Sequence, residues 1–140
     1  MKNFVLLATT IILLDRIMKF LALQGSYGSY EKNYGLLFGL LANPQLRWLF
    51  VAIMALILIF FLYVASMKEV RRNKLLFLGL ILMITGLISN LLDRILYSFI
   101  IDFIRLAELT TFNIADISIT AGAILIAFNL LRGERKRSRQ

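Results

Sequence analysis

The sequence predicts an all-α integral membrane protein with four transmembrane helices and both termini in the cytoplasm. Of its 140 residues, 60% are hydrophobic, whereas a soluble domain contains about 45–50% apolar residues. The excess lies in runs that approach or exceed the roughly 20 apolar residues needed to cross a bilayer. The basic residues also gather on one side of a four-span topology. We therefore expect a single membrane domain over residues 1–140, without a separate soluble domain.

The first expected helix covers residues 3–23 and is the least apolar of the four, because Asp15, Arg16 and Lys19 interrupt it. A cleaved signal peptide is an alternative interpretation of this segment. Its apolar stretch ends at Asp15-Arg16, however, rather than at a cleavage site of small residues. We therefore expect the segment to be retained as a helix.

The other three helices contain uncharged or nearly uncharged runs of 20, 18 and 23 residues. Asn43-Pro44 marks a boundary before the second helix, because proline disfavours a helical conformation in the residue before it. The expected elements are helices over 45–67, 75–97 and 110–131, outer connections over 24–44 and 98–109, a basic inner turn over 68–74, and a basic cytoplasmic tail over 132–140.

The net charge of +8 is unevenly distributed along the chain. Ten of the sixteen Lys and Arg residues precede the first span, lie between the second and third, or follow the fourth. This is the positive-inside pattern, which places both termini in the cytoplasm and the basic tail against anionic membrane lipid. Nucleic-acid binding is the alternative explanation of the charge, and the distribution argues against it.

The chain has no Cys and no His. Disulfides, thiol nucleophiles and thiolate metal sites are therefore excluded for this chain. A Ser-His-Asp triad and the common zinc-protease motif are excluded as well. The remaining candidates for chemistry are carboxylates, amides, hydroxyls and amines.

Two acidic residues, Asp102 and Asp116, have apolar neighbours and no Lys or Arg within two positions. A carboxylate in such sequence usually marks a functional site. Two carboxylates in one dry site share a proton, as in aspartic proteases. Alternatively, Asp102 is a surface loop acid and Asp116 pairs with a basic residue. A shared site requires the chain to tilt, bend or fold back near 97–101, because a straight helix would carry Asp102 beyond the membrane core.

Other polar residues cluster towards the same outer side. Asn90, Asp93 and Arg94 share one helix face. Arg94 either positions a carboxylate or substrate carbonyl, or anchors the helix at the interface. Asp15 and Lys19, at i and i+4, either form an ion pair or leave Lys19 to reach a lipid phosphate or substrate headgroup.

Three residues of the connections complete the candidate set. Asn33 can bind peptide groups through both its donor and its acceptor, and Gly35 allows a close approach of backbone to a ligand. An ordinary loop is the alternative for this segment. Asn113 either hydrogen-bonds the site or caps the fourth helix.

In chain order, these residues resemble the motifs of the bacterial lipoprotein signal peptidases, also called signal peptidase II. The resemblance covers nearly the whole chain, and five ordered motifs on four spans are specific although each alone is weak. The matching segments are Asp15-Arg16-Ile17-Met18-Lys19, Asn33-Tyr34-Gly35-Leu36-Leu37-Phe38-Gly39, Asn90-Leu91-Leu92-Asp93-Arg94, Ile101-Asp102-Phe103 and Phe112-Asn113-Ile114-Ala115-Asp116.

The resemblance implies an intramembrane aspartic endopeptidase of the bacterial inner membrane, with its site towards the outer leaflet and no metal or organic cofactor. It implies that Asp102 and Asp116 are catalytic, and that Asn33, Asn90, Arg94 and Asn113 line the site and hold substrate. The implied substrates are diacylglyceryl prolipoproteins, cut just before the lipidated Cys of the lipobox. Globomycin-type compounds are the implied inhibitors.

The chain departs from the family pattern in three places. Ser89 replaces the glycine before Asn90, Thr85 replaces the first glycine of a pair, and the stretch from Lys19 to Asn33 is shorter than usual. In the family that stretch builds part of an outer substrate cradle, so the expected fold includes a small β cradle in the outer connections. The short stretch puts substrate range and inhibitor grip in doubt, whereas the serine is tolerable. The second outer connection is also short, and none of these departures touches the aspartates.

Two other functions remain as alternatives. One is a Ser/Lys peptidase, in which Lys19 activates Ser89 or Ser98. The other is a non-catalytic membrane protein, either an ion or proton pathway or a family member that binds lipoproteins without cutting them. The apolar inner halves of the helices argue against a pathway, and the presence of both aspartates argues against a degenerate member.

Overall fold

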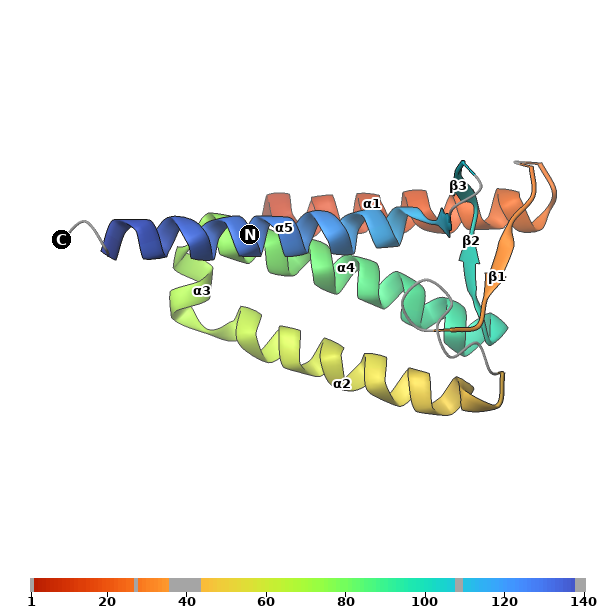
Figure 1. Cartoon of the computed structure of the whole chain (residues 1–140), viewed down its shortest axis with the longest axis horizontal. Helices are drawn as coiled ribbons and strands as arrows, with labels where there is room; N and C mark the ends of the chain where they lie inside the picture. The colour runs from red at the N-terminus through yellow and green to blue at the C-terminus, as the bar shows by residue number, and fades with distance from the viewer. Residues whose placement is uncertain (1, 27, 36–43, 108–109, 138–140) are drawn as a thin grey trace.

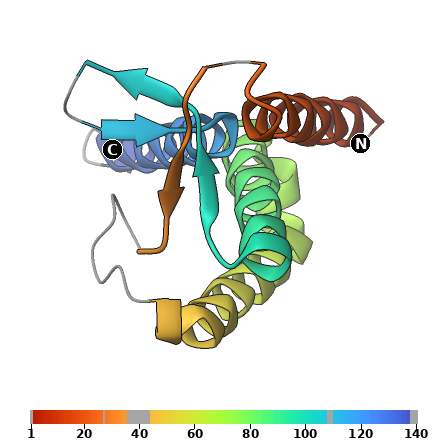
Figure 2. The same cartoon turned by 90° about the vertical axis from the view of Figure 1, so that its right-hand side faces the viewer.

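The computed structural model describes residues 2–26, 28–35, 44–107 and 110–137. The described chain forms four helices of 20 to 24 residues, and short strands cross one end of them (Figures 1 and 2). In chain order the elements are α1 Lys2–Leu23, β1 Glu31–Asn33, the 3-10 turn η1 Pro44–Leu46, α2 Arg47–Ser66, α3 Lys68–Arg72, α4 Lys74–Tyr97, β2 Ile100–Asp102, β3 Ile104–Leu106, β4 Thr110–Phe112 and α5 Ile114–Arg137.

Helix α4 is the centre of the bundle, because α1, α2 and α5 all pack against it. Its contact with α5 is close because glycines face each other there. A Cβ on Gly79 would lie 2.9 Å from the carbonyl oxygen of Gly122 and 2.8 Å from the side chain of Ile126. Small residues that let helix backbones approach are a common basis of helix packing in membranes.

The connections that follow α1 and α4 contain short paired strands, as expected for a small β cradle. Strand β1 pairs antiparallel with β2, placing Glu31 opposite Asp102, and β3 pairs antiparallel with β4. The backbone N–H of Phe103 donates to the carbonyl of Phe112 (3.1 Å), which links the two two-stranded sheets. Figure 2 shows these strands lying across the helix ends.

The outer surface of the bundle is apolar. Three helices of the described segments are long and apolar enough to cross a membrane: α2, α4 and α5 as far as Arg132. Large side chains such as Leu56 and Phe60 are 67% and 58% exposed. A surface of this kind is suited to lipid, so the chain is membrane-embedded.

Several expected boundaries were wrong. The fourth helix was expected from residue 110, but 110–112 form β4, because these β-branched and aromatic residues pair with β3 and Asn113 then begins the helix. The expected tail over 132–140 is helical as far as Arg137, and residues 138–140 lie outside the described residues. The inner turn over 68–74 contains the five-residue helix α3.

The bend expected near 97–101 is confirmed. Helix α4 ends at Tyr97, and Ser98 adopts a left-handed conformation with φ of 73°. The chain then returns across the helix ends as β2, whose three residues are all buried. This reversal carries Asp102 back over the bundle.

Candidate active site

Asp116 is held by the start of its own helix. The side-chain oxygen of Asn113 accepts from the backbone N–H of Asp116 (2.9 Å), and Oδ2 of Asp116 accepts from the backbone N–H of Asn113 (3.2 Å). This reciprocal pair is a capping box, which satisfies two backbone groups at the N-terminus of α5. Oδ2 of Asp116 is thereby fixed, and Oδ1 faces α4.

Asn113 also brings the two aspartates together. Its side-chain N–H donates to Oδ1 of Asp102 (2.7 Å), while its oxygen and backbone N–H bind Asp116. The two interpretations of Asn113, capping the helix and bonding the site, therefore hold at once. Asp102 and Asp116 also line the same cavity, so the spatial meeting inferred from the sequence is observed.

Two further asparagines donate to the aspartates. Nδ2 of Asn33, at the end of β1, donates to Oδ2 of Asp102 (3.0 Å). Nδ2 of Asn90, on α4, donates to Oδ1 of Asp116 (2.7 Å). Each carboxylate thus accepts two N–H groups, and the donors come from three parts of the chain that are distant in sequence.

The surroundings of Asp102 shift its pKa, since only 1% of the residue is exposed. Burial, and then the negative charge of nearby Asp116, raise the pKa of Asp102 from 3.8 to about 7. Hydrogen bonds from Asn33 and Asn113 and the charge of Lys19 offset part of this rise. Near neutral pH the site therefore holds a carboxyl that gains or loses a proton readily, as proton-transfer chemistry requires.

Next to the carboxylates lies a cluster of four charged side chains, three of them buried and the fourth, Arg16, 24% exposed. Nζ of Lys19 is 2.8 Å from Oδ2 of Asp15 and 2.7 Å from Oδ2 of Asp93. Arg16 adds contacts of 2.7 Å to Asp93 and 3.3 Å to Asp15. The expected Asp15–Lys19 ion pair is therefore present within a larger network, with two positive and two negative side chains. Such mutual neutralisation allows charges to be buried.

Asp15 also reaches the neighbouring helices. Its Oδ1 accepts from the backbone N–H of Ala115 (3.1 Å), and its Oδ2 accepts from the hydroxyl of Ser89 (2.5 Å). Ala115 is in the first turn of α5, one residue before Asp116. Asp15 thus ties α1 to the helix start that carries Asp116, and Ser89 adds a contact that a glycine there would lack.

Arg94 is fully buried and holds the chain after β1. Its guanidinium donates to the carbonyl of Tyr34 (3.0 Å) and to that of Gly35, and it lies over the ring of Phe50 (4.9 Å). The structure thus gives Arg94 backbone carbonyls as partners. Gly35 N–H in turn donates to Oδ1 of Asn33 (3.1 Å). Residues 36–39 of this expected motif lie outside the described residues.

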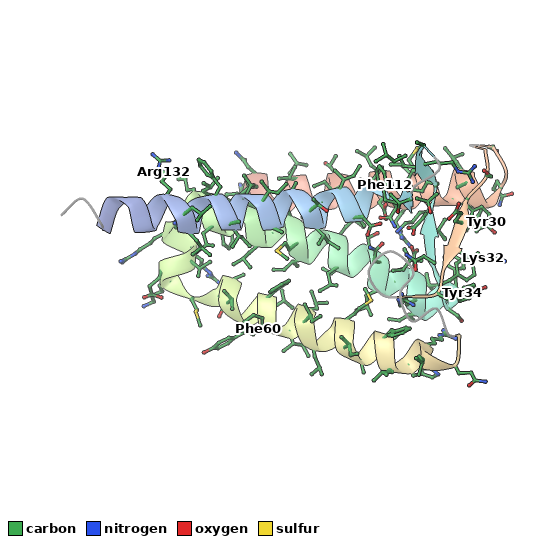
Figure 3. All side chains as sticks on the ribbon, viewed as in Figure 1. Tyr30, Lys32, Tyr34, Phe60, Phe112 and Arg132 are labelled. Carbon is green, nitrogen blue, oxygen red and sulfur yellow. The ribbon has the colours of Figure 1, made fainter. Side chains whose placement is uncertain are left out.

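A cavity of about 420 Å³ opens between α2, α4 and α5. Its polar end holds the two aspartates with Asn33, Asn90 and Arg94. The rest is mainly apolar and includes Ile53, Ile57, Phe61, Met83, Leu87 and Ile119. Phe112, which also lines the cavity, lies at the strand end of the bundle, and Arg132 lies towards the far end of α5 (Figure 3). The cavity thus joins a carboxylate pair to an apolar groove, which suits an apolar peptide.

Every candidate residue from the sequence lies in or next to this site. Asn33, Asn90 and Asn113 contact the aspartates, Gly35 and Arg94 line or support the cavity mouth, and Asp15, Lys19 and Asp93 form the charge cluster. Sequence reasoning missed Arg16 as a site residue, although it is a third charge beside Asp15 and Lys19 in the first helix. In the described parts of the chain, no three acidic side chains are grouped as metal ligands.

Comparisons with known proteins agree with these motifs. Residues 7–132 match the family model described as signal peptidase (SPase) II. The lipoprotein signal peptidase of Moorella thermoacetica is 32% identical over 141 residues, covering 91% of this chain and 92% of that protein. The lipoprotein signal peptidase of Blochmanniella pennsylvanica is 41% identical over 103 residues, which cover 69% of this chain. The match spans 62% of that relative, less than two thirds of its length.

The fold also matches a solved structure. A bacterial membrane enzyme has a TM-score of 0.80 and 26% identity to the chain, and the match covers 94% of each. The short strands and the helices therefore belong to a known architecture.

Proposed function

Because the chain belongs to the signal peptidase II family, we propose that it is a membrane-embedded aspartic endopeptidase that removes the signal peptide from prolipoproteins. The observation that carries this proposal is the pair Asp102 and Asp116, which share Asn113 at the polar end of an otherwise apolar cavity. With neither Cys nor His in the chain, carboxylates are the groups suited to activate water here.

In the proposed mechanism the two aspartates hold one proton between them. The ionised member takes a proton from water, whose oxygen attacks the scissile carbonyl carbon. The protonated member gives its proton to the carbonyl oxygen, so a neutral tetrahedral diol forms. The diol then returns one hydroxyl proton to the aspartate that is now ionised, the other aspartate donates its proton to the leaving nitrogen, and the C–N bond breaks, so the pair again holds one proton. Asn33, Asn90 and Asn113 keep the carboxylates oriented throughout.

The proposed substrate is a prolipoprotein whose lipobox Cys already carries diacylglycerol, and the bond cut is the one just before that Cys. The cavity supports this choice, because its polar end meets the peptide bond while Ile57, Phe61 and Leu87 offer an apolar surface next to it. Membrane lipid and globomycin-type inhibitors are the further proposed partners, since both present acyl chains or apolar side chains to such a surface. Neither a metal nor an organic cofactor enters the proposed reaction.

We propose that α1 is a fourth span despite its charges. Asp15 and Lys19 point inwards and are 0% and 1% exposed, whereas apolar residues such as Leu6 and Phe20 are 69% and 59% exposed. The face of α1 that would meet lipid is therefore apolar. Charges buried inside a bundle in mutual contact are tolerated in membranes.

The start of α1 and the end of α5 lie towards the opposite end of the bundle from the strands (Figure 1). Helix α3, with Lys68, Arg71 and Arg72, lies at the same end as the last turns of α5. The positive-inside rule assigns this end to the cytoplasm. We accordingly place both termini in the cytoplasm of a bacterial cell, the protein in the inner membrane, and the active site at the outer leaflet.

The contacts of the serines and Lys19 favour the aspartic mechanism over a Ser/Lys peptidase. Lys19 is bound by Asp15 and Asp93, and the hydroxyl of Ser89 donates to Asp15. Within the described residues, Nζ of Lys19 contacts these two carboxylates and the side chain of Asn90, and none of its contacts there is with a serine hydroxyl. Ser98 ends α4 in a left-handed turn. The variants Ser89→Ala and Ser98→Ala are therefore expected to cleave substrate, whereas a Ser/Lys mechanism requires one of them to fail.

The test is cleavage of a diacylglyceryl prolipoprotein by the purified protein in detergent, followed by mass spectrometry of both products. We expect one cut, just before the lipidated Cys, and its loss when globomycin is added. The same prolipoprotein without diacylglycerol is the matched control and should be cut far more slowly. Binding of a lipobox peptide without any product would instead identify a non-catalytic member of the family.

A further inference from the structure

Lys19 lies two contacts away from Asp116 and is linked to it through Asn90. Its Nζ donates to Oδ1 of Asn90 (3.0 Å), and Nδ2 of Asn90 donates to Oδ1 of Asp116 (2.7 Å). We propose that Lys19 is a positioning residue for catalysis, which fixes the orientation of the Asn90 amide and thereby keeps Asp116 supplied with a hydrogen-bond donor. This inference rests on the proposed aspartic mechanism.

The need for such a residue follows from the shape of an amide. The oxygen and nitrogen ends of Asn90 are nearly the same size, so packing alone does not choose between the two orientations. Lys19 can only donate hydrogen bonds, and therefore the oxygen of Asn90 must face it. The NH₂ group then faces Asp116. The opposite orientation would set the amide oxygen against the carboxylate and NH₂ against the ammonium.

The other two asparagines are oriented differently. Oδ1 of Asn33 accepts from the backbone N–H of Gly35, and Oδ1 of Asn113 accepts from the backbone N–H of Asp116. Backbone N–H groups at these positions do not depend on a distant side chain. Of the three asparagines that donate to the aspartates, Asn90 is the one whose orientation comes from another side chain, on another helix.

The charge cluster provides a matched comparison. Arg16 touches the same two carboxylates as Lys19, at 2.7 Å from Asp93 and 3.3 Å from Asp15, and also donates to the carbonyl of Ser89 (3.1 Å). Within the described residues, its guanidinium makes no hydrogen bond to the side chain of Asn90. Removing Arg16 therefore also takes a positive charge away from the two carboxylates but leaves the amide of Asn90 held by Lys19.

The test compares two double variants in which the cluster stays neutral, Asp15→Asn/Lys19→Met and Asp15→Asn/Arg16→Met. Each loses one positive and one negative charge, so any cost of changing Asp15 is common to both. Purified proteins are compared by kcat and KM for a lipidated prolipoprotein and by Tm in detergent. We expect both to have a lowered Tm, and kcat of the Lys19 variant to lie about 10- to 100-fold below kcat of the Arg16 variant, the factor attached to a hydrogen bond to a charged group, with their KM values within about threefold of each other.

A third change tests the route through Asn90. Asn90→Leu alone should lower kcat by a similar factor, and adding it to Asp15→Asn/Lys19→Met should lower kcat by less than a further threefold, because both changes remove the same contact. Losses that multiply would overturn the inference, as would equal kcat values for the Lys19 and Arg16 variants. After such a result, the variants Asp102→Asn and Asp116→Asn separate the two possible failures. If they turn over substrate normally, the proposed mechanism itself fails. If they are inactive, only the role of Lys19 fails.

Discussion

Replacing Asp102 with asparagine should change how the stability of the protein depends on pH. The pKa of Asp102 is raised from 3.8 to about 7, first by burial and then by the charge of Asp116. A carboxyl whose pKa is raised on folding favours the folded state below pH 4. That contribution is lost as the pH rises from about 4 to about 7, because the unfolded chain ionises first.

The size of the effect follows from the shift. About three pKa units at about 1.4 kcal/mol each give an upper limit of about 4 kcal/mol. Asparagine does not ionise and lacks this term. Its NH₂ group, however, must face the donor of either Asn33 or Asn113, which hold the two oxygens of Asp102. An unsatisfied donor of this kind costs about 1–3 kcal/mol at every pH.

The two contributions predict that the plots of melting temperature against pH for the variant and the wild type cross. At pH 4.5 the Asp102→Asn variant should melt at a lower temperature than the wild type, and at pH 8.5 at an equal or higher temperature. Thermal unfolding in one detergent at both pH values measures this. Glu31→Gln is the matched control, since Glu31 lies opposite Asp102 on β1 but has a side chain that is 55% exposed, and its melting should follow the wild type. Parallel curves for Asp102→Asn and the wild type would refute this electrostatic account of the site.

Further predictions concern packing and the shared asparagine. Gly86→Ala should destabilise the protein by about 1–3 kcal/mol, because the added Cβ would clash with the Ala115 carbonyl and lie 2.7 Å from the Ile119 side chain. Thermal melting in detergent measures this, and an unchanged Tm would contradict the close α4–α5 contact. Asn113→Leu should lower kcat more than Asn33→Leu in a cleavage assay, since Asn113 contacts both aspartates and Asn33 only one; equal losses would argue against a bridging role.

The sequence was most informative where periodicity and composition decide the structure. Apolar runs of nearly fixed length predicted α2, α4 and most of α5, and the isolated acids Asp102 and Asp116 marked the site. The bend after α4 could be predicted because two carboxylates that share a site must meet. Which residue makes the bend could not be predicted, because the left-handed residue is Ser98, whereas glycine is the residue that usually marks such a helix end.

The rest depends on contacts between distant parts of the chain. Arg94 binds carbonyls of Tyr34 and Gly35, and nothing in its own neighbourhood indicates these partners. Strand β4 was expected to be helix, because an apolar run of this length is ambiguous until β3 is found beside it. Arg16 pairs with Asp93 across two helices, which only the packing of α1 on α4 reveals.

The most direct test of the aspartic mechanism is a gel-shift assay of prolipoprotein cleavage by purified Asp102→Asn and Asp116→Asn variants, with Tm measured in parallel. Each change keeps the size of the side chain and removes its ability to exchange a proton. The mechanism predicts that neither variant releases signal peptide while both retain cooperative melting. Turnover at the wild-type rate by either folded variant would contradict it.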